Sequence, residues 1–257
     1  RLSRAFGPRV EKDAPLGAIT TYRVGGRATA MITIESVDDL VELHRILDGQ
    51  IVPMLVIGRG SNMLVADSGF DGIVVRWGSA GDSIDVPTDD SPSSDNVVTV
   101  TAGAMALLPV VARRTAAAGL TGFEWAVGVP GSIGGAVRMN AGGHGSDMAA
   151  SLLDVEVFDF ASGTARVRSA ADLGLRFRGS DLSDDHVVVR ARLALRRADP
   201  DRTTAAIDEI VRWRRENQPG GQNAGSVFVN PVPGEVSAGE LIDRAGLRGF
   251  RIGTAEV

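Results

Sequence analysis

Two glycine-rich segments carry the clearest chemical signal in this 257-residue sequence. The first, Gly58–Asn62, directly follows the apolar run Met54–Ile57, and the second extends from Gly128 to Gly145. A tight glycine turn after a strand exposes backbone N–H groups that can hold phosphate. Because each glycine costs backbone entropy on folding, a closely approaching ligand is the simplest compensation. We therefore predict one extended diphosphate ligand held by both loops, although a plain β-turn explains the first loop alone equally well.

The first loop differs from two familiar nucleotide-binding motifs. A dinucleotide fingerprint requires a third glycine where Met63 stands and then a helix, whereas the residues after Leu64 predict another strand. A Walker loop requires a lysine and a different spacing, and Gly58–Ser61 has neither. The sequence therefore argues against both motifs.

Two further segments contain residues that could act on a substrate. Leu175–Ser180 holds two arginines and a serine, and Asn223–Pro231 places Ser226 between a glycine and a short apolar stretch. Taken alone, such an arginine forms a surface salt bridge, and such a serine bonds to the backbone of a turn. The residues by themselves leave these structural roles open.

Short β-branched segments surround the motifs and predict strands. Ala161–Thr164 joins two of them and supplies Gly163 where a hairpin turn needs positive φ. The expected strands are Ala30–Ile34, Met54–Ile57, Gly72–Arg76, Val97–Thr101, Val155–Phe160, Ala165–Arg168 and His186–Leu195.

Helical patterns and caps predict helices between and after the strands. The first helix is capped by Ser36 and has the apolar face Val37, Leu40, Val41 and Leu47, and the second is Leu107–Ala118, which ends at Gly119. The third is marked by Ile207, Ile210 and Val211. The fourth is Leu241–Ala245, with a capping box of Ser237 and Glu240 and an end at Gly246. Helical patterns become more frequent than strand patterns after about Arg197. We predict an α+β fold with two domains, residues 1–198 (subdomains at roughly 14–76 and 77–198) and residues 199–257, joined at Ala198–Asp201.

Composition narrows the function classes. The chain contains no cysteine, which excludes disulfides, a thiolate nucleophile and a cysteinyl cofactor link, and is compatible with a reducing, cytoplasmic location. Its net charge of -5 comes from interspersed acids and bases, so we expect no nucleic-acid partner. No apolar run approaches the roughly 20 residues of a membrane helix. We also expect no metal site, no membrane partner and no secretory signal at the N-terminus.

The glycine loops together resemble the FAD-binding half of the vanillyl-alcohol-oxidase-like (PCMH-type) flavoproteins, and specifically the UDP-N-acetylenolpyruvoylglucosamine reductases. Thr21–Gly26 is similar to that family's entry into the FAD domain, and the likeness covers the chain from Ala14 onward. The resemblance implies that both loops wrap the FAD diphosphate and approach the flavin ring. The implied FAD contacts are Gly58, Arg59, Gly60, Ser61, Asn62, Leu64, Gly128, Pro130, Gly131, Ser132, Gly134, Gly135, Asn140, Gly142, His144 and Gly145.

The resemblance extends to the two remaining segments. Leu175–Ser180 is similar to the family's Tyr-Arg-x-Ser segment, with Phe177 in place of Tyr and Arg178 at the active-site arginine. Asn223–Pro231 resembles the substrate-domain signature, which implies Ser226 as the proton donor and Asn230 as a substrate contact. Arg214, Arg215 and Gln218 could meet the substrate's diphosphate or sugar, unless the two arginines only form a solvated helix face.

The family's reaction is the implied activity, with a role in peptidoglycan synthesis and through it in cell-wall biogenesis, cell shape, cell division and the cell cycle. NADPH reduces FAD and leaves, and UDP-N-acetylglucosamine enolpyruvate then accepts hydride and becomes UDP-N-acetylmuramate. We expect non-covalent FAD, because cysteine is absent and no histidine lies in the first loop. We also expect a monomer. The family's catalytic glutamate is expected beyond Val257, and the short Pro219–Asn223 connection favours the compact subfamily.

Two other interpretations stay open at this point. One is another FAD-dependent oxidase or dehydrogenase of the same superfamily that acts on a sugar or alcohol. The other is an inactive flavin-binding module. The Asn223–Pro231 segment argues against the first, and Arg178 and Ser226 argue against the second.

Overall fold

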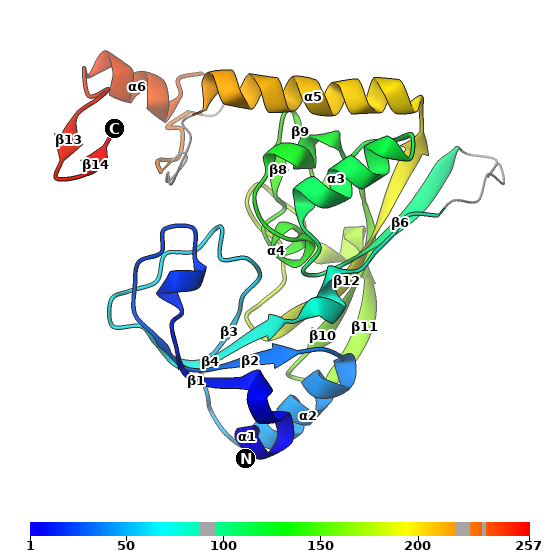
Figure 1. Ribbon diagram of the computed structural model, residues 1–257, viewed down its shortest axis with the longest axis vertical. Coiled ribbons are helices and arrows are strands. Elements are labelled where there is room, and N and C mark those ends of the chain that lie inside the picture. The colour runs from blue at the N-terminus through cyan, green and yellow to red at the C-terminus, as the bar shows by residue number, and fades with distance from the viewer. Residues whose placement is uncertain (88–95, 219–226, 233–234) are drawn as a thin grey trace. The chain divides into compact units, whose positions relative to one another are not determined.

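The computed structural model describes residues 1–87, 96–218, 227–232 and 235–257, which divide into two compact units, Arg1–Gln218 and Pro219–Val257 (Figure 1). The helices are α1 (Leu2–Phe6), α2 (Val37–Leu47), α3 (Leu108–Ala117), α4 (Ile133–Arg138), α5 (Pro200–Asn217) and α6 (Ala238–Arg244). The strands are β1 (Val10–Ala14), β2 (Ala28–Ile34), β3 (Met54–Val56), β4 (Phe70–Trp77), β5 (Ile84–Asp85), β6 (Val97–Gly103), β7 (Leu120–Thr121), β8 (Gly142–Gly143), β9 (Ser146–Asp147), β10 (Leu152–Asp159), β11 (Thr164–Ser169), β12 (His186–Arg197), β13 (Arg251–Ile252) and β14 (Ala255–Glu256). All seven predicted strands are confirmed.

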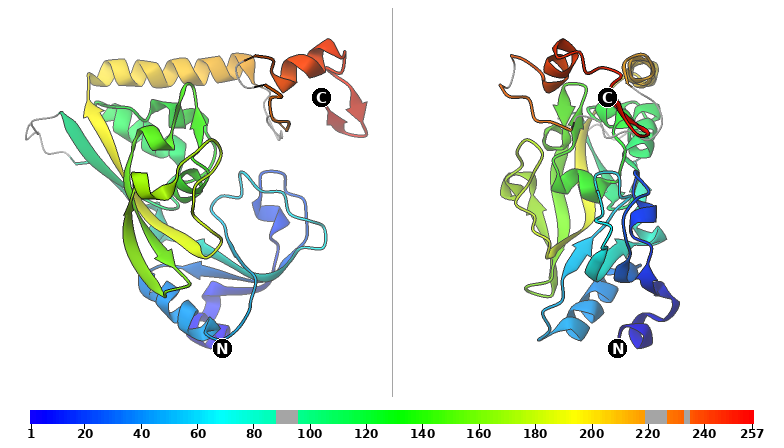
Figure 2. Two further views of the ribbon diagram at one scale, coloured as in Figure 1. Left: turned by 180° about the vertical axis from the view of Figure 1, so that it is seen from behind. Right: turned by 90° about the vertical axis from the view of Figure 1, so that its left-hand side faces the viewer.

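The first sheet has the strand order β1-β2-β4-β3, in which β2, β4 and β3 run parallel and β1 is antiparallel to β2. Its two faces belong to different clusters of buried apolar side chains, as expected for parallel strands covered on both sides. One face packs under α1 and α2, which lie together beside this sheet (Figures 1 and 2). Val41 was predicted on the apolar face of α2 but is 43% exposed, whereas Leu40, Leu43 and Ile46 are the buried residues of this helix.

A carboxylate near the N-terminus of α2 ties this helix to the segment before β1. The Asp39 side chain accepts hydrogen bonds from both terminal nitrogens of Arg9 and from the backbone N–H of Glu35, 2.9 Å away. Ser36 caps the helix as predicted, because its Oγ accepts from the Asp39 N–H. Burial raises the pKa of Asp39, but the bonds from Arg9, Glu35 and Ser36 together hold this pKa below its usual value.

The second sheet is antiparallel, with the order β11-β10-β12-β6-β5, and β7 pairs with the end of β12. The predicted hairpin between β10 and β11 is confirmed, and Gly163 has φ +67° in its turn. Helix α4 packs on β12, and α3 contacts α5. The two sheets are joined by a buried hydrogen bond of 2.9 Å from the Trp77 indole N–H to the Val188 carbonyl.

Helix α5 belongs to the first unit, beyond the connector predicted at Ala198–Asp201. Asp199 caps the helix by accepting from the N–H groups of Asp201 and Arg202. The Thr203 hydroxyl then donates to the Ala116 carbonyl of α3 at 2.7 Å, and Ile207 is only 4% exposed. Because α5 makes these contacts, the first compact unit extends to Gln218.

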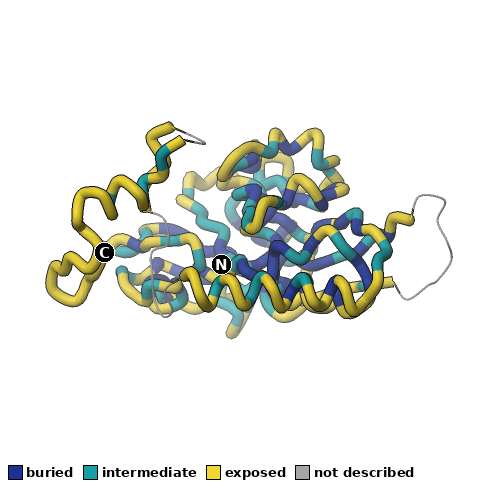
Figure 3. The backbone as a smooth tube through the Cα atoms, turned by 90° about the horizontal axis from the view of Figure 1, so that it is seen from above, coloured by how far each residue is buried: buried dark blue, intermediate teal, exposed yellow. Residues whose placement is uncertain are grey.

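The second unit consists of α6 and the hairpin β13–β14 in the residues described, and most of these residues are exposed (Figure 3). Ser237 caps α6 through the Glu240 N–H at 3.1 Å, and Gly246 has φ +69° after the helix, as predicted. The reciprocal half of the capping box is replaced, because the Glu240 carboxylate pairs with Arg244. None of the helices described is both long and apolar enough to cross a membrane.

Candidate functional site

The two glycine loops, far apart in sequence, meet in the first unit. A Cβ on Gly58 would lie 2.5 Å from the Ser132 hydroxyl oxygen, and a Cβ on Gly131 would lie 2.8 Å from the Ser61 hydroxyl oxygen. The Ser61 hydroxyl also donates a 3.4 Å hydrogen bond to the Pro130 carbonyl. The structure thus brings together the ends of the two predicted diphosphate loops.

Gly60 is required by the protein backbone itself. Its φ is +63°, and a Cβ there would lie 2.6 Å from the Ile19 carbonyl oxygen. The Thr21 N–H donates to the Gly60 carbonyl at 3.1 Å, so the first loop packs on the start of the predicted Thr21–Gly26 segment. A larger side chain at Gly60 would therefore displace this packing as well as a ligand.

Several groups around the two loops are available to a ligand. The backbone N–H groups of Gly58–Asn62 make no hydrogen bond to any residue that the structure describes. The Ser132 hydroxyl is buried, starts α4 without capping it, and has no partner in the described part of the chain. A buried hydroxyl without a partner costs about 1–3 kcal/mol, so a ligand oxygen here would be stabilising.

Gly135 shows where a ligand has room. It lies exposed in the middle of α4 with ordinary φ, and a Cβ built on it would meet nothing within 4 Å. Neither backbone conformation nor packing explains a glycine there, although glycine costs a helix about 0.5–1 kcal/mol relative to alanine. Gly134 differs, because its Cβ would lie 3.2 Å from Ala104. The donors of the first loop, the Ser132 hydroxyl and the space at Gly135 fit the FAD diphosphate.

Other predicted FAD contacts take varied positions. Arg59 pairs with Asp82 at 3.2 Å on the surface, and Leu64 is 73% exposed. His144 has φ +50°, and its ring packs edge-on against Trp213 with centroids 5.0 Å apart. Trp213 was not predicted from sequence as a site residue, and no motif surrounds it. Its contact explains how α5 reaches the second glycine loop.

The predicted substrate residues of α5 separate into two kinds. Arg214 lies over the second glycine loop, since a Cβ on Gly128 would be 2.8 Å from its Cδ. Arg215 and Gln218 are exposed, which matches the solvated-face alternative for Arg215. In the second unit, the Asn230 side chain accepts a 3.0 Å hydrogen bond from the Ala238 N–H. Ser226 lies outside the described residues.

Arg178 lies at the tip of a closed loop, Leu173–Asp181, which we call the arginine loop. The Asp181 N–H donates to the Leu173 carbonyl at 2.8 Å and closes its neck. Arg178 has φ +58°, which costs a non-glycine residue about 1–2 kcal/mol. Its guanidinium is exposed and forms no hydrogen bond or ion pair with the described residues, lying 5.6 Å from the Phe177 ring centroid.

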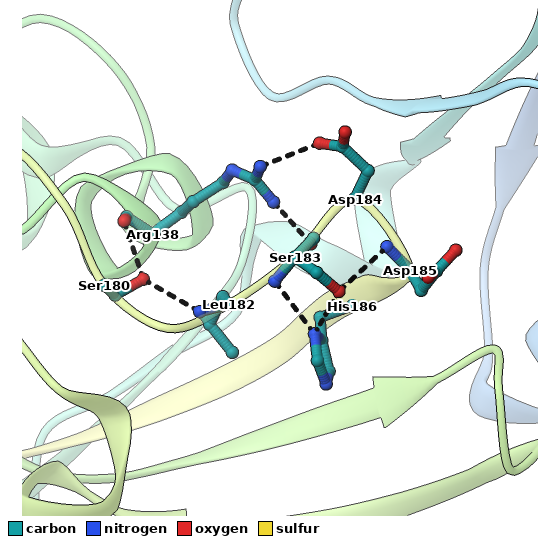
Figure 4. Close-up of polar contacts among 7 residues, drawn as sticks. All are labelled: Arg138, Ser180, Leu182, Ser183, Asp184, Asp185 and His186. Carbon is teal, nitrogen blue, oxygen red and sulfur yellow. Dashed lines mark hydrogen bonds and ion pairs between the residues drawn. The ribbon is translucent and has the colours of Figure 1, made fainter.

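The Ser180 side chain is buried and hydrogen-bonded within the protein. It is 8% exposed, donates to the Arg138 carbonyl at 2.7 Å and accepts from the Leu182 N–H at 3.3 Å (Figure 4). Arg138 also pairs with Asp184, which follows the arginine loop. Arg178 and Ser180 are the two residues that match the Tyr-Arg-x-Ser segment. Of these, only Arg178 has a side chain without hydrogen bonds to the described residues.

Two protein families match the chain. The FAD binding domain family matches residues 28–168, and the family described as UDP-N-acetylenolpyruvoylglucosamine reductase, C-terminal domain, matches residues 217–257. The UDP-N-acetylenolpyruvoylglucosamine reductase of Synechococcus sp. is 42% identical over 252 residues, which cover 96% of this chain and 79% of that protein. That of Paramagnetospirillum magneticum is 40% identical over 97% of this chain and 77% of its own length.

Solved structures agree with these matches. The crystal structure of the reductase from Thermus caldophilus has a TM-score of 0.79 and 37% identity, covering 97% of this chain and 84% of that one. A VAO-type flavoprotein from Myceliophthora thermophila has a TM-score of 0.51 at 15% identity, over 66% of this chain and 32% of that one. This second likeness concerns the fold alone.

Proposed function

Because the chain belongs to the UDP-N-acetylenolpyruvoylglucosamine reductase family, an FAD-containing oxidoreductase family of peptidoglycan precursor synthesis, we propose that NADPH is its hydride donor and that its FAD is bound without a covalent link. The reaction is the reduction of UDP-N-acetylglucosamine enolpyruvate to UDP-N-acetylmuramate. When bound, FAD would supply the hydride for this reduction. The other interpretations, an alcohol or sugar oxidase and an inactive module, are not favoured by these relatives.

The two glycine loops are the proposed FAD diphosphate site. The N–H groups of Gly58–Asn62 and the Ser132 hydroxyl would donate to the diphosphate oxygens, and the open space at Gly135 admits the cofactor next to the backbone of α4. Non-covalent binding is supported by the absence of cysteine and of a histidine in the first loop. His144 packs on Trp213, which supports a contact role for it.

The strained, exposed Arg178 is the observation that carries the catalytic part of the proposal. A residue held at φ +58° with a free guanidinium indicates a function that outweighs the strain. Hydride addition to the enolpyruvyl double bond builds negative charge on the adjoining carboxylate system. A planar guanidinium at this position would stabilise that charge more in the transition state than in the bound substrate.

The carbon next to the hydride acceptor needs a proton, and we propose that the Ser226 hydroxyl donates it. Asn230 and Arg214 are the proposed substrate contacts, with Arg215 and Gln218 as further contacts near the end of α5. Asn230 already accepts from Ala238, so it would offer the substrate its amide N–H groups. The proposal also includes a monomeric enzyme, and a cytoplasmic one since its substrates are soluble nucleotides.

A combined spectral and kinetic experiment on the full-length protein tests this function. We expect a flavin absorption spectrum, release of intact FAD on denaturation, and turnover of the enolpyruvyl sugar nucleotide with NADPH. Arg178→Ala should keep its FAD and its rate of flavin reduction by NADPH but slow flavin reoxidation by substrate, with partial recovery in Arg178→Lys because the planar fork is lost. Arg166→Ala, at an exposed arginine of β11, is the control. A colourless protein that binds no added FAD refutes the cofactor site, and normal reoxidation in both Arg178 variants refutes the role of Arg178.

A further inference from the structure

We propose that Asn140 is a positioning residue for Arg178: it ties the arginine loop to the second glycine loop and thereby holds the guanidinium where hydride transfer occurs. This inference rests on the proposed role of Arg178. Asn140 was predicted from the sequence as an FAD contact. Its hydrogen bonds indicate a different task.

The tip of the arginine loop is a four-residue turn from Arg176 to Gly179. The two end residues form both bonds of an antiparallel bridge, with the Arg176 N–H 3.0 Å from the Gly179 carbonyl and the Gly179 N–H 3.1 Å from the Arg176 carbonyl. Arg178 is the third residue and has positive φ, whereas Phe177 does not, which is the pattern of a type II turn. That position favours glycine, so an arginine there needs external support to stay in one conformation.

Asn140 supplies that support from a buried position. It is 6% exposed, and its amide nitrogen donates to the Arg176 carbonyl at 3.2 Å and to the Asp147 carboxylate at 3.0 Å. Its amide oxygen accepts from the Ala149 N–H at 2.9 Å. One side chain therefore joins the first residue of the turn to the hairpin β8–β9, whose tip carries His144.

The same bonds argue against an FAD contact as the main task of this side chain. Both N–H bonds of the Asn140 amide are used within the protein, so it has no donor left for a diphosphate or a flavin oxygen. A second anchor, the bond from Ser180 to the Arg138 carbonyl (Figure 4), attaches the loop independently. Loss of Asn140 should therefore release the tip of the arginine loop without detaching the loop.

A double-mutant cycle on the full-length holoenzyme tests the proposal. Asn140→Gly removes the side chain while glycine tolerates the φ of +39° at this position. We expect unchanged FAD content and unchanged flavin reduction by NADPH, and reoxidation by the enolpyruvyl substrate slowed roughly 10–100-fold, as for a misplaced catalytic group. In an Arg178→Ala background the same change should slow reoxidation by less than about two-fold, because the group it positions is gone.

Two further variants keep the outcome decisive. Asn140→Asp retains the acceptor for Ala149 and removes both donors, so it repeats the cycle if the glycine variant folds poorly. Ser151→Ala removes another buried bond, from the Ser151 hydroxyl to the Gly122 carbonyl at 2.7 Å, and should leave both half-reactions normal. Equal slowing in both Arg178 backgrounds, or loss of FAD from the Asn140 variants, overturns the positioning role even if Arg178 proves essential. A normal Arg178→Ala enzyme instead overturns the proposed catalytic role of Arg178, on which the positioning role depends.

Discussion

Replacing Gly135 by alanine should stabilise the apoprotein and weaken FAD binding at the same time. Gly135 is exposed within α4, and a Cβ there meets no protein atom within 4 Å. Alanine should therefore stabilise the helix by about 0.5–1 kcal/mol, with no steric cost from the protein. For a protein of this size that corresponds to a rise of roughly 1–4 °C in the melting temperature of the apoprotein.

The FAD complex should respond in the opposite direction. If the cofactor occupies the open space, a new methyl group overpacks its contact and costs about 1–3 kcal/mol. The dissociation constant for FAD should then rise by roughly 5–150-fold. The two effects have opposite signs, which a general loss of folding cannot imitate.

Thermal unfolding of the apoprotein and titration with FAD, followed by flavin fluorescence, measure the two effects separately. Gly239→Ala is a matched control, because Gly239 lies in α6 and a Cβ there would have only the Ser237 hydroxyl near it, at 4.0 Å. It should share the helix stabilisation and leave FAD affinity unchanged. A stabilised Gly135→Ala apoprotein with the FAD affinity of the unmodified protein would show that the cofactor does not approach α4 at this residue.

Two further predictions concern proton transfer and acid stability. In the full-length protein, Ser226→Ala should leave flavin reduction by NADPH nearly intact and slow reoxidation by roughly 10²–10⁴-fold, while Ser226→Cys retains more of it; stopped-flow absorbance of the flavin measures both steps, and slow reduction with normal reoxidation would contradict the assigned role. Asp39→Asn should cost about 1 kcal/mol in urea unfolding at pH 7, because the amide carries no charge and has one acceptor oxygen in place of the two that accept from Arg9. Since the folded pKa of Asp39 is lowered, its stabilisation is fully present above the unfolded value of about 3.9 and is lost as the pH falls through the folded pKa. The two proteins should thus converge in acid, and a constant difference down to the lowest pH would exclude the ionised carboxylate as its source.

The elements predicted correctly from sequence are those whose own residues specify them. β-Branched runs such as Gly72–Arg76 and His186–Leu195 predicted β4 and β12, and the Ser237 cap predicted the start of α6. Helix α4 was missed because two of its six residues are glycines, which disfavour helix on their own. Strand β1 was missed because its residues Val10–Ala14 are mostly polar and exposed at the sheet edge.

The candidate site shows the same division. The glycine loops could be predicted, because glycine density is a local property of the sequence. The tie between Asn140 and the arginine loop could not, because its acceptor is a backbone carbonyl 36 positions away, and any residue type supplies that atom. The inclusion of α5 in the first unit could not be predicted from the sequence either, because it depends on the packing of Thr203 and Ile207 on α3 and its surroundings.

The closed neck of the arginine loop has a consequence for how this enzyme can change in evolution. Because the Asp181 N–H bonds to the Leu173 carbonyl, strands β11 and β12 enter and leave the loop without depending on its tip. Phe177 at that tip is 85% exposed and contributes little to the core. Substitutions of Phe177 should therefore have little effect on folding. The side chain at Phe177 can therefore vary while the sheet that carries the loop stays the same.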